Sequence, residues 1–401
     1  MTAVAKRCVL YVSGFDPKGA SYYHALYRDE SASQGKPGGQ APEVGARRRH
    51  ASGNAFWSVQ VRVGEQQVET HYEFMRWDDV VRAHWPKNTW ALWRDVIASS
   101  VFYLRHGTWW KMFRLAWAPA VAVLTPFLLV CALLLGVPLL AITCAWLASG
   151  LLGHWGLGVL AGGVGACVLW LLGRKIEARY NMYWMMRSYA FTARQARGEV
   201  PDLEARLDQL AQCLVDRVRQ QADDEVLVVG HSSGAIMAAI IVARALRIAP
   251  DLLAGRTSVA LLTLGQWIPL LGLLPMAHQF RAELQVLGAA DGLTWTDFSA
   301  PPDGCCFALC DPFAACGIER HASDGVHLKL LNPRFATLFD AAAYRALKRD
   351  KFKLHFQYLR ATGKPGAYNY FDITAGPLSL GERFKESQSV TGYTGLRPFG
   401  D

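Results

Sequence analysis

The 401-residue chain carries little charge for its size, and one long stretch carries none. Charged residues make up 19% of the sequence and hydrophobic residues 52%, whereas soluble domains have about 25% charged residues. From Leu115 to Gly173 there is no Asp, Glu, Lys or Arg. This composition excludes a wholly soluble protein and predicts contact with a membrane.

Features of a secreted protein are also missing. The nine cysteines are scattered, and three of them (Cys131, Cys144 and Cys167) fall in the apolar middle, so a disulfide framework is not expected. Residues 1–7 lead directly into a strand pattern without the apolar core of a signal peptide. We therefore expect a reducing, cytoplasmic setting for the part outside the membrane.

The sequence lacks a nucleic-acid-binding motif despite its formal net charge of +9. Its basic residues are not gathered into stretches that interleave aromatic side chains with Lys and Arg. An anionic membrane surface accounts for the positive charge more simply. The expected partner is a membrane, and no nucleic acid is expected.

The uncharged stretch is long enough for two membrane-spanning helices, since each needs about 20 residues. The small residues 148–150 predict a turn, which gives spans over 117–147 and 151–172. Three prolines in the first span predict a kink or an irregular start. They also make a three-span arrangement arguable, but an odd number would put the two halves of one sheet on opposite sides of the membrane.

The flanks of this hairpin are basic and aromatic. Lys111 and Arg114 precede it, and Arg174, Lys175 and Arg179 follow it, so both ends are expected in the cytoplasm. Residues 84–117 contain six tryptophans, a residue that favours the membrane–water boundary.

The most informative motif is a strand, a sharp turn and a helix. An apolar run over 226–229 leads into Gly230-His231-Ser232-Ser233-Gly234, and residues 235–246 contain no Gly or Pro. In a Gly-x-Ser-x-Gly turn the serine has a strained backbone, and small residues on each side let strand and helix approach. Ser232 is therefore predicted to stand exposed above the sheet edge as a nucleophile.

This turn, together with a strand running into Val12-Ser13-Gly14-Phe15-Asp16-Pro17 and a later strand followed by an aspartate, resembles the α/β-hydrolase family. The resemblance covers residues from about 9 to 82 and from about 201 onward, but not the apolar middle. It implies an α/β fold with a mostly parallel sheet flanked by helices, here interrupted by a two-helix transmembrane hairpin. The expected parts are residues 1–114, the hairpin 115–173, and residues 174–401.

Other elements follow from periodicity and turn residues. Residues 31–54 are rich in Gly, Ser, Pro and Arg, which predicts a mobile loop or lid. The segment 280–287 is compatible with either helix or strand. The remaining predictions are strands at 8–12, 56–63, 67–75, 258–264 and 293–298, and helices at 20–28 and within 176–220, with a break at 198–201.

A serine nucleophile needs a base and an acid, and in the family resembled they follow the serine in the order acid, then His. For the acid we prefer Asp303, in a Pro-Pro-Asp-Gly loop after a predicted strand, over Asp297 and Asp291. His231 is expected to point away and to serve in packing.

For the base, the candidates are His321, His327 and His355. We prefer His355 on chain order, and His327 stays open. The resemblance also implies an oxyanion hole formed by the backbone amides of Phe15 and Ser233.

A second cluster of interest is Cys305, Cys306, Cys310, Cys316 and His321. It lacks the Cys-x-x-Cys spacing of zinc sites, so free, partly buried thiols are expected. No metal and no cofactor is predicted.

The expected function is a membrane-anchored serine hydrolase, an esterase or lipase that cleaves acyl esters, with lipid-derived esters as the expected substrates, through an acyl-Ser232 intermediate. Two alternatives are open. One is an inactive hydrolase-like membrane scaffold or partner-binding protein. The other is an acyltransferase that uses the same serine.

Overall fold

The computed structural model describes residues 4–38, 41–319 and 325–390. Within them lies one mixed sheet of nine strands in the order β2-β4-β5-β1-β6-β7-β8-β9, with β3 also paired to β4. Strands β5, β1, β6, β7, β8 and β9 run parallel, and β4 is antiparallel to its neighbours. The strands are β1 Lys6–Val12, β2 Glu43–Val44, β3 Arg48–Arg49, β4 Ala55–Val63, β5 Gln66–Phe74, β6 Glu225–His231, β7 Ser258–Leu264, β8 Thr294–Phe298 and β9 His327–Leu331.

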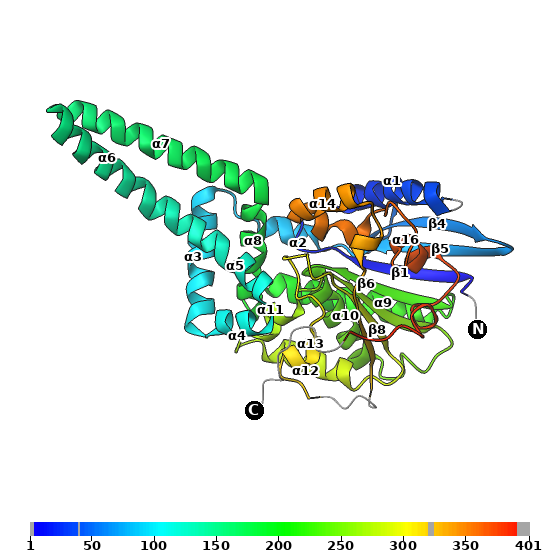
Figure 1. Ribbon diagram of the computed structural model, residues 1–401. Helices are drawn as coiled ribbons and strands as arrows, with labels where there is room; N and C mark the ends of the chain where they lie inside the picture. Colours follow the sequence, from blue (N-terminus) through cyan, green and yellow to red (C-terminus); the bar gives the residue numbers. More distant parts are fainter. Residues whose placement is uncertain (1–3, 39–40, 320–324, 391–401) are drawn as a thin grey trace.

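Helices cover both faces of the sheet and form a projecting arm (Figure 1). In the first half of the chain they are α1 Ala20–Gly38, α2 Asp78–Ala83, α3 Thr89–Arg105, α4 Thr108–Leu115, α5 Trp117–Cys131, the π-helix η1 Ala132–Gly136, α6 Val137–Leu152, α7 Trp155–Tyr180 and α8 Met182–Ala196. In the second half they are α9 Pro201–Arg219, α10 Gly234–Ile248, α11 Ile268–Gly272, α12 His278–Gly288, α13 Pro312–Ala315, η2 Phe335–Thr337, α14 Ala341–Arg349, α15 Lys351–His355, η3 Gln357–Leu359, α16 Tyr370–Ala375 and α17 Leu380–Arg383. The ambiguous segment 280–287 is therefore helical.

The central strands are buried on both faces, as a parallel sheet requires. Alternate residues of β1 and β6 enter two different cores, because successive side chains point to opposite sides of a strand. Val226 and Val228 pack with helices α9, α10 and α12 on one face. Leu227 and Val229 pack on the other face with α1 and the aromatic C-terminal segments.

The uncharged stretch forms two helices that are long and apolar enough to cross a membrane, Trp117–Leu151 and Trp155–Arg179. Only 11% and 17% of their most apolar windows are buried, which sets them apart from core helices of a soluble protein. They pack against each other and project from the body as the arm made by α6 and α7 (Figure 1).

The predicted turn of this hairpin at residues 148–150 is wrong. Those residues lie inside α6, and the chain reverses at Gly153 and His154 instead. Gly153 has a φ of +69°, the left-handed conformation that ends helices and suits glycine. Gly150 is compatible with the helix, so small size alone did not locate the turn. The expected irregularity does occur, as the π-helix η1 just before Pro138.

The predicted loop over residues 31–54 is also wrong in large part. Helix α1 continues to Gly38, and β2 and β3 pair with β4. The hydroxyls of Ser31 and Ser33 donate to main-chain carbonyls of Arg28 and Asp29. The polar side chains are therefore satisfied within the helix, which composition did not reveal.

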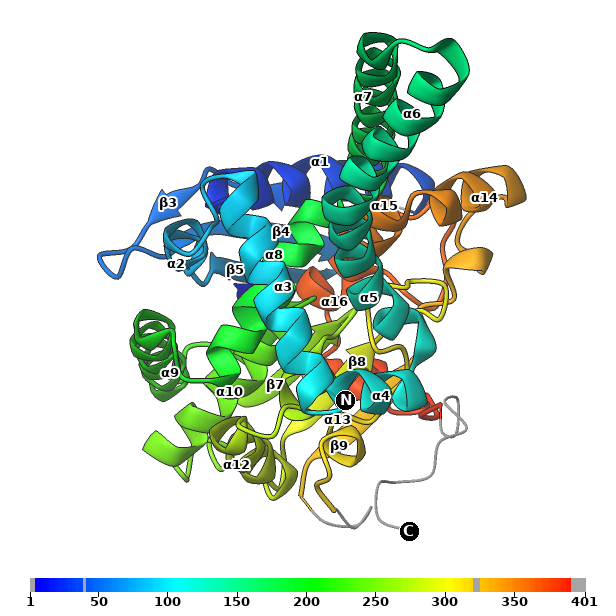
Figure 2. The ribbon, with the colours of Figure 1, turned by 90° about the vertical axis from the view of Figure 1, so that its left-hand side faces the viewer.

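The base of the arm is part of the folded body. Figure 2 shows α3, α4, α5 and α8 gathered below it. Ala120 and Val123 of α5 belong to the main core, while Val130 and Leu133 pack with residues of α3 and α8. The membrane-compatible helices are thus anchored in the body by their inner ends.

Candidate active site

Ser232 stands at the carboxyl end of β6, where the chain turns sharply into α10. Its φ is +60°, a strained value for a residue with a side chain. Gly230 and Gly234 are required on either side, because a Cβ on them would lie 2.6 Å and 2.4 Å from main-chain atoms. The strand, turn and helix expected from the sequence are therefore present, with Ser232 at the strained position. The expected exposure of Ser232 is wrong, since the residue is only 7% exposed.

The loop after β1 lies directly against this turn. A Cβ on Gly14 would lie 3.1 Å from Ser232 Cβ and 3.5 Å from its Oγ. The Phe15 N–H donates to Ser233 Oγ at 2.8 Å, so this expected oxyanion donor already has an acceptor. Within the described chain the Ser233 N–H has none. The Phe15 ring points away and packs against Phe191 and Trp85.

Asp303 and His355, the acid and base chosen from the sequence, are hydrogen-bonded to each other. The distance from His355 Nδ1 to Asp303 Oδ2 is 2.9 Å, and both side chains are buried. Because a carboxylate accepts, Nδ1 carries a proton and Nε2 of the neutral ring is left as the basic atom.

Further donors hold the Asp303 carboxylate. Tyr358 donates its hydroxyl to Oδ2 at 3.1 Å, and the Cys305 N–H donates to Oδ1 at 3.0 Å. Burial by itself raises the pKa of Asp303, but the His355 charge and these hydrogen bonds outweigh it and lower the pKa below its ordinary value. Asp303 is therefore held as an anion beside His355.

The serine and the acid–base pair meet at the same edge of the sheet. Ser232 N–H donates to the Leu264 carbonyl at the end of β7, and a Cβ on the next residue, Gly265, would lie 3.4 Å from Asp303 Oδ2. Among the described residues no hydrogen bond joins Ser232 Oγ to His355. Catalytic hydrogen bonds in unliganded enzymes are often long and tighten only with substrate.

His231 has a more specific place than the packing role expected for it. Its Nε2 donates to the His355 carbonyl at 2.9 Å, and the two ring centroids are 5.0 Å apart. Burial, with a smaller contribution from the His355 charge, lowers the pKa of His231 to about 3. A neutral His231 therefore ties the turn at Ser232 to the segment that carries His355.

The alternative residues lie elsewhere. His327 is the first residue of β9 and pairs with Thr294. It lies four residues before the sheet edge that carries Ser232, a distance of about 13 Å along the strand. His321 lies outside the described residues. Asp291 is exposed, and Asp297 is buried within β8 and accepts from Thr263 and Ser299.

Two residues that support the site were not predicted from the sequence. They are Tyr358, and His231 through its contact with His355. Tyr358 lies three residues after His355, a spacing that places both on one side of a helical turn. That spacing is the only signal in the sequence, because Asp303 is 55 positions away from Tyr358.

The neighbouring cysteines are free thiols in the described chain. Burial raises the pKa of Cys305, Cys306, Cys310 and Cys316. Cys306 and Cys310 approach main-chain carbonyls. Inert thiols packed around the Asp303 loop fit this arrangement.

A cavity of about 260 Å³ lies between the Asp303 loop and the base of the arm. It is lined on one side by residues 113–119, where α4 meets α5, and on the other by Pro301, Asp303, Cys306 and Ala308. On the opposite flank of the site, Trp184 of α8 packs against Phe352 and Phe356, next to His355. Asp303 therefore lies close to the start of the first apolar helix.

Comparisons with protein-family models, with curated proteins and with solved structures found no match for this chain. The class that the structure defines is an α/β protein with a mostly parallel mixed sheet flanked by helices and with two candidate membrane-spanning helices.

Proposed function

We propose that this protein is a membrane-anchored serine hydrolase of the α/β-hydrolase type that cleaves acyl esters carried by lipids. The observation that carries the proposal is the buried Asp303–His355 hydrogen bond, at 2.9 Å, beside a serine with a φ of +60°. A serine on a strained strand-to-helix turn, followed in the chain by an acid and a histidine, is the arrangement of that class.

Ser232, His355 and Asp303 each have a separate role in the proposed reaction. Ser232 Oγ attacks the ester carbonyl while His355 Nε2 takes its proton, and Asp303 stabilises the imidazolium that forms. The alcohol leaves with the proton of His355, and water, activated by the same nitrogen, then releases the acid from acyl-Ser232. The net reaction is hydrolysis of one ester bond.

The developing oxyanion needs donors beside Ser232. The Ser233 N–H, at the start of α10, is the first of them. The Ser233 hydroxyl accepts from Phe15 and keeps its own proton, so it can donate as well. Phe15 itself contributes directly only if its N–H exchanges Ser233 Oγ for the substrate oxygen.

A lipid substrate is favoured by where the site lies. Helix α4 buries Met112 and Leu115 and exposes Trp110 and Phe113, the pattern of a helix that lies at a membrane surface. The cavity at the junction of α4 and α5 leads to Asp303. With the arm inserted, basic residues at both ends favour a body on the cytoplasmic side, and an acyl chain can enter from the bilayer.

The test is covalent labelling of the detergent-solubilised protein with a fluorophosphonate, followed by mass mapping. We expect modification at Ser232, none in Ser232→Ala, and a rate about 10²–10⁴-fold lower in His355→Gln, because the base is lost. The control His327→Gln, on an exposed histidine, should label like the wild type.

Hydrolysis of short- and long-chain esters in mixed micelles then tests the substrate. Added alcohol acceptors show whether water is the acceptor. A folded wild type that does not label would overturn the proposal and favour the scaffold alternative.

A further inference from the structure

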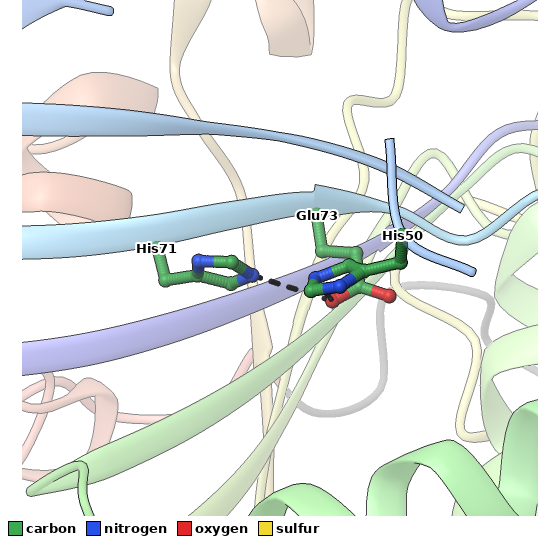
Figure 3. Close-up of side chains that lie close together, drawn as sticks. All are labelled: His50, His71 and Glu73. Atoms are coloured by element: carbon green, nitrogen blue, oxygen red, sulfur yellow. Dashed lines mark hydrogen bonds and ion pairs between the residues drawn. The ribbon is translucent and has the colours of Figure 1, made fainter. Parts of the chain in front are cut away.

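Three potential metal ligands meet on β5, away from the Ser232 turn in the sequence. His71 and Glu73 are two residues apart and therefore share one face of the strand, and His50 follows β3. Both Nε2 atoms face Glu73 Oε2, at 3.4 Å from His71 and 3.7 Å from His50. Their ligand atoms all lie within 4.8 Å of one another (Figure 3).

The three side chains are held in place by their neighbours. Asn54 donates to the other oxygen of Glu73 at 2.7 Å, and accepts from the Arg76 N–H at 2.9 Å. The ring of Phe56 stacks on both imidazoles, with centroid distances of 4.2 Å to His50 and 4.9 Å to His71. A partner that fixes a ligating carboxylate is typical of metal sites.

Burial and charge also suit a cation. The Glu73 side chain is 11% exposed, whereas His50 is 43% exposed, so one side of the cluster is open to water. The nearby Arg217 is bound by both oxygens of Asp223, at 2.6 Å and 2.8 Å. Its charge is therefore compensated and does not neutralise Glu73.

We propose that His50, His71 and Glu73 bind one divalent transition-metal ion, Zn²⁺ by preference, with the remaining position open to solvent. Two imidazoles and a carboxylate are a ligand set that zinc uses, at about 2.0–2.2 Å. Tetrahedral geometry at those lengths places ligand atoms about 3.3 Å apart, close to the 3.4 Å and 3.7 Å separations between Glu73 Oε2 and the two histidines. The two histidine nitrogens lie within 4.8 Å of each other and move together when the ion binds.

The bound ion links the turn between β3 and β4 to β5. That turn is a short one, closed by bonds between His50 and Asn54 and between Gly53 and His50. No metal is predicted here from the sequence, in which the cysteine cluster is the densest group of ligand residue types. The signal that was available is His-x-Glu on a strand.

The test is zinc titration by calorimetry on the full-length detergent-solubilised protein, prepared without a histidine tag. We expect one equivalent bound by the wild type, at least tenfold weaker binding by His71→Gln or Glu73→Gln, and none by the double variant His50→Gln/His71→Gln. The control His278→Gln, an exposed histidine on α12, should bind like the wild type.

Two further readouts do not depend on activity. Co²⁺ should give visible absorption bands of a low-coordinate site in the wild type, and Zn²⁺ should raise its unfolding temperature, since a ligand of the native state stabilises it. Neither effect should occur in the double variant, whose folding is checked by circular dichroism without metal. Equal zinc binding by the folded double variant, or no stoichiometric binding by the wild type, overturns the proposal.

Discussion

Two buried groups, His231 on β6 and Asp297 on β8, have pKa values shifted in opposite directions. Burial, and to a smaller extent the charge of His355, lowers the pKa of His231 from 6.5 to about 3. Burial raises the pKa of Asp297 from 3.8 to about 7, although hydrogen bonds from Ser299 and Thr263 oppose it. Near pH 5 both groups are therefore neutral in the folded protein, whereas both are charged in the unfolded chain.

These shifts have opposite effects on stability. Between about pH 3 and 6.5 the unfolded chain binds a proton at His231 that the folded protein does not, so stability rises with pH. Between about pH 3.8 and 7 the folded protein holds a proton at Asp297 that the unfolded chain has lost, so stability falls with pH. In the shared window the two contributions to the slope largely cancel.

Removing either group should expose the slope of the other. Relative to wild type, Asp297→Asn should make the free energy of unfolding rise more steeply with pH between 4.5 and 6, by up to about 1.4 kcal/mol per pH unit. His231→Gln should change the slope by a similar amount in the opposite direction. Urea unfolding in detergent, followed by tryptophan fluorescence, measures both.

Asp291→Asn and His327→Gln are the matched controls, since both residues are exposed. Their slopes should equal that of the wild type. Parallel curves for all five proteins would show that neither His231 nor Asp297 has a shifted pKa.

At the scale of elements, the Ser232 turn depends on contact between main chains. A Cβ on Gly234 would lie 2.4 Å from the Val12 carbonyl oxygen and 2.5 Å from that of Ser13. Gly304, in the Asp303 loop, has no atom within 4 Å of the same position and no positive φ. The two positions thus differ in the room available for a side chain rather than in backbone conformation.

Gly234→Ala should therefore lower the free energy of unfolding by about 3 kcal/mol or more, because β1 and α10 must separate. Gly304→Ala should stay within about 0.5 kcal/mol of the wild type. Chemical unfolding of the two variants side by side checks this. An equal, small effect at both positions would mean that α10 can shift without cost.

The same local physics explains what could be predicted from the sequence. Strands β6, β7 and β8 and helix α10 follow from apolar runs and turn residues, whereas the choice of Asp303 and His355 followed the chain order that the resemblance implies. The contacts of Tyr358 and His231 with this pair could not be predicted, because they depend on how loops after different strands pack. The hairpin turn was misplaced because Ala148 and Ser149 fit a helix equally well.

At the scale of the molecule, the apolar arm has two parts. The inner part is built into the body, since Val123, Val130 and Leu133 are buried. The outer part is exposed, with Leu135, Trp146 and Leu151 at 72%, 73% and 83%. The two helices touch where the parts meet, because a Cβ on Gly136 would lie 3.6 Å from Leu169. The outer part can therefore be removed without cutting the core.

A chain in which residues 138–167 are replaced by a short Gly-Ser linker should keep the site and lose the anchor. We expect fluorophosphonate labelling of Ser232 within about twofold of the wild type, because the acid, the base and the α4–α5 junction stay in place. Alkaline extraction should release this chain from membranes and leave the wild type behind. What remains of the second helix is too short for a span, and the remaining stretch 117–137 is held in the body by its buried residues Val123, Val130 and Leu133. Ser232→Ala in the shortened chain is the labelling control, and circular dichroism checks its fold. A folded shortened chain that resists extraction would assign the anchoring to the amphipathic helix α4, and one that fails to label would make the outer arm part of the site.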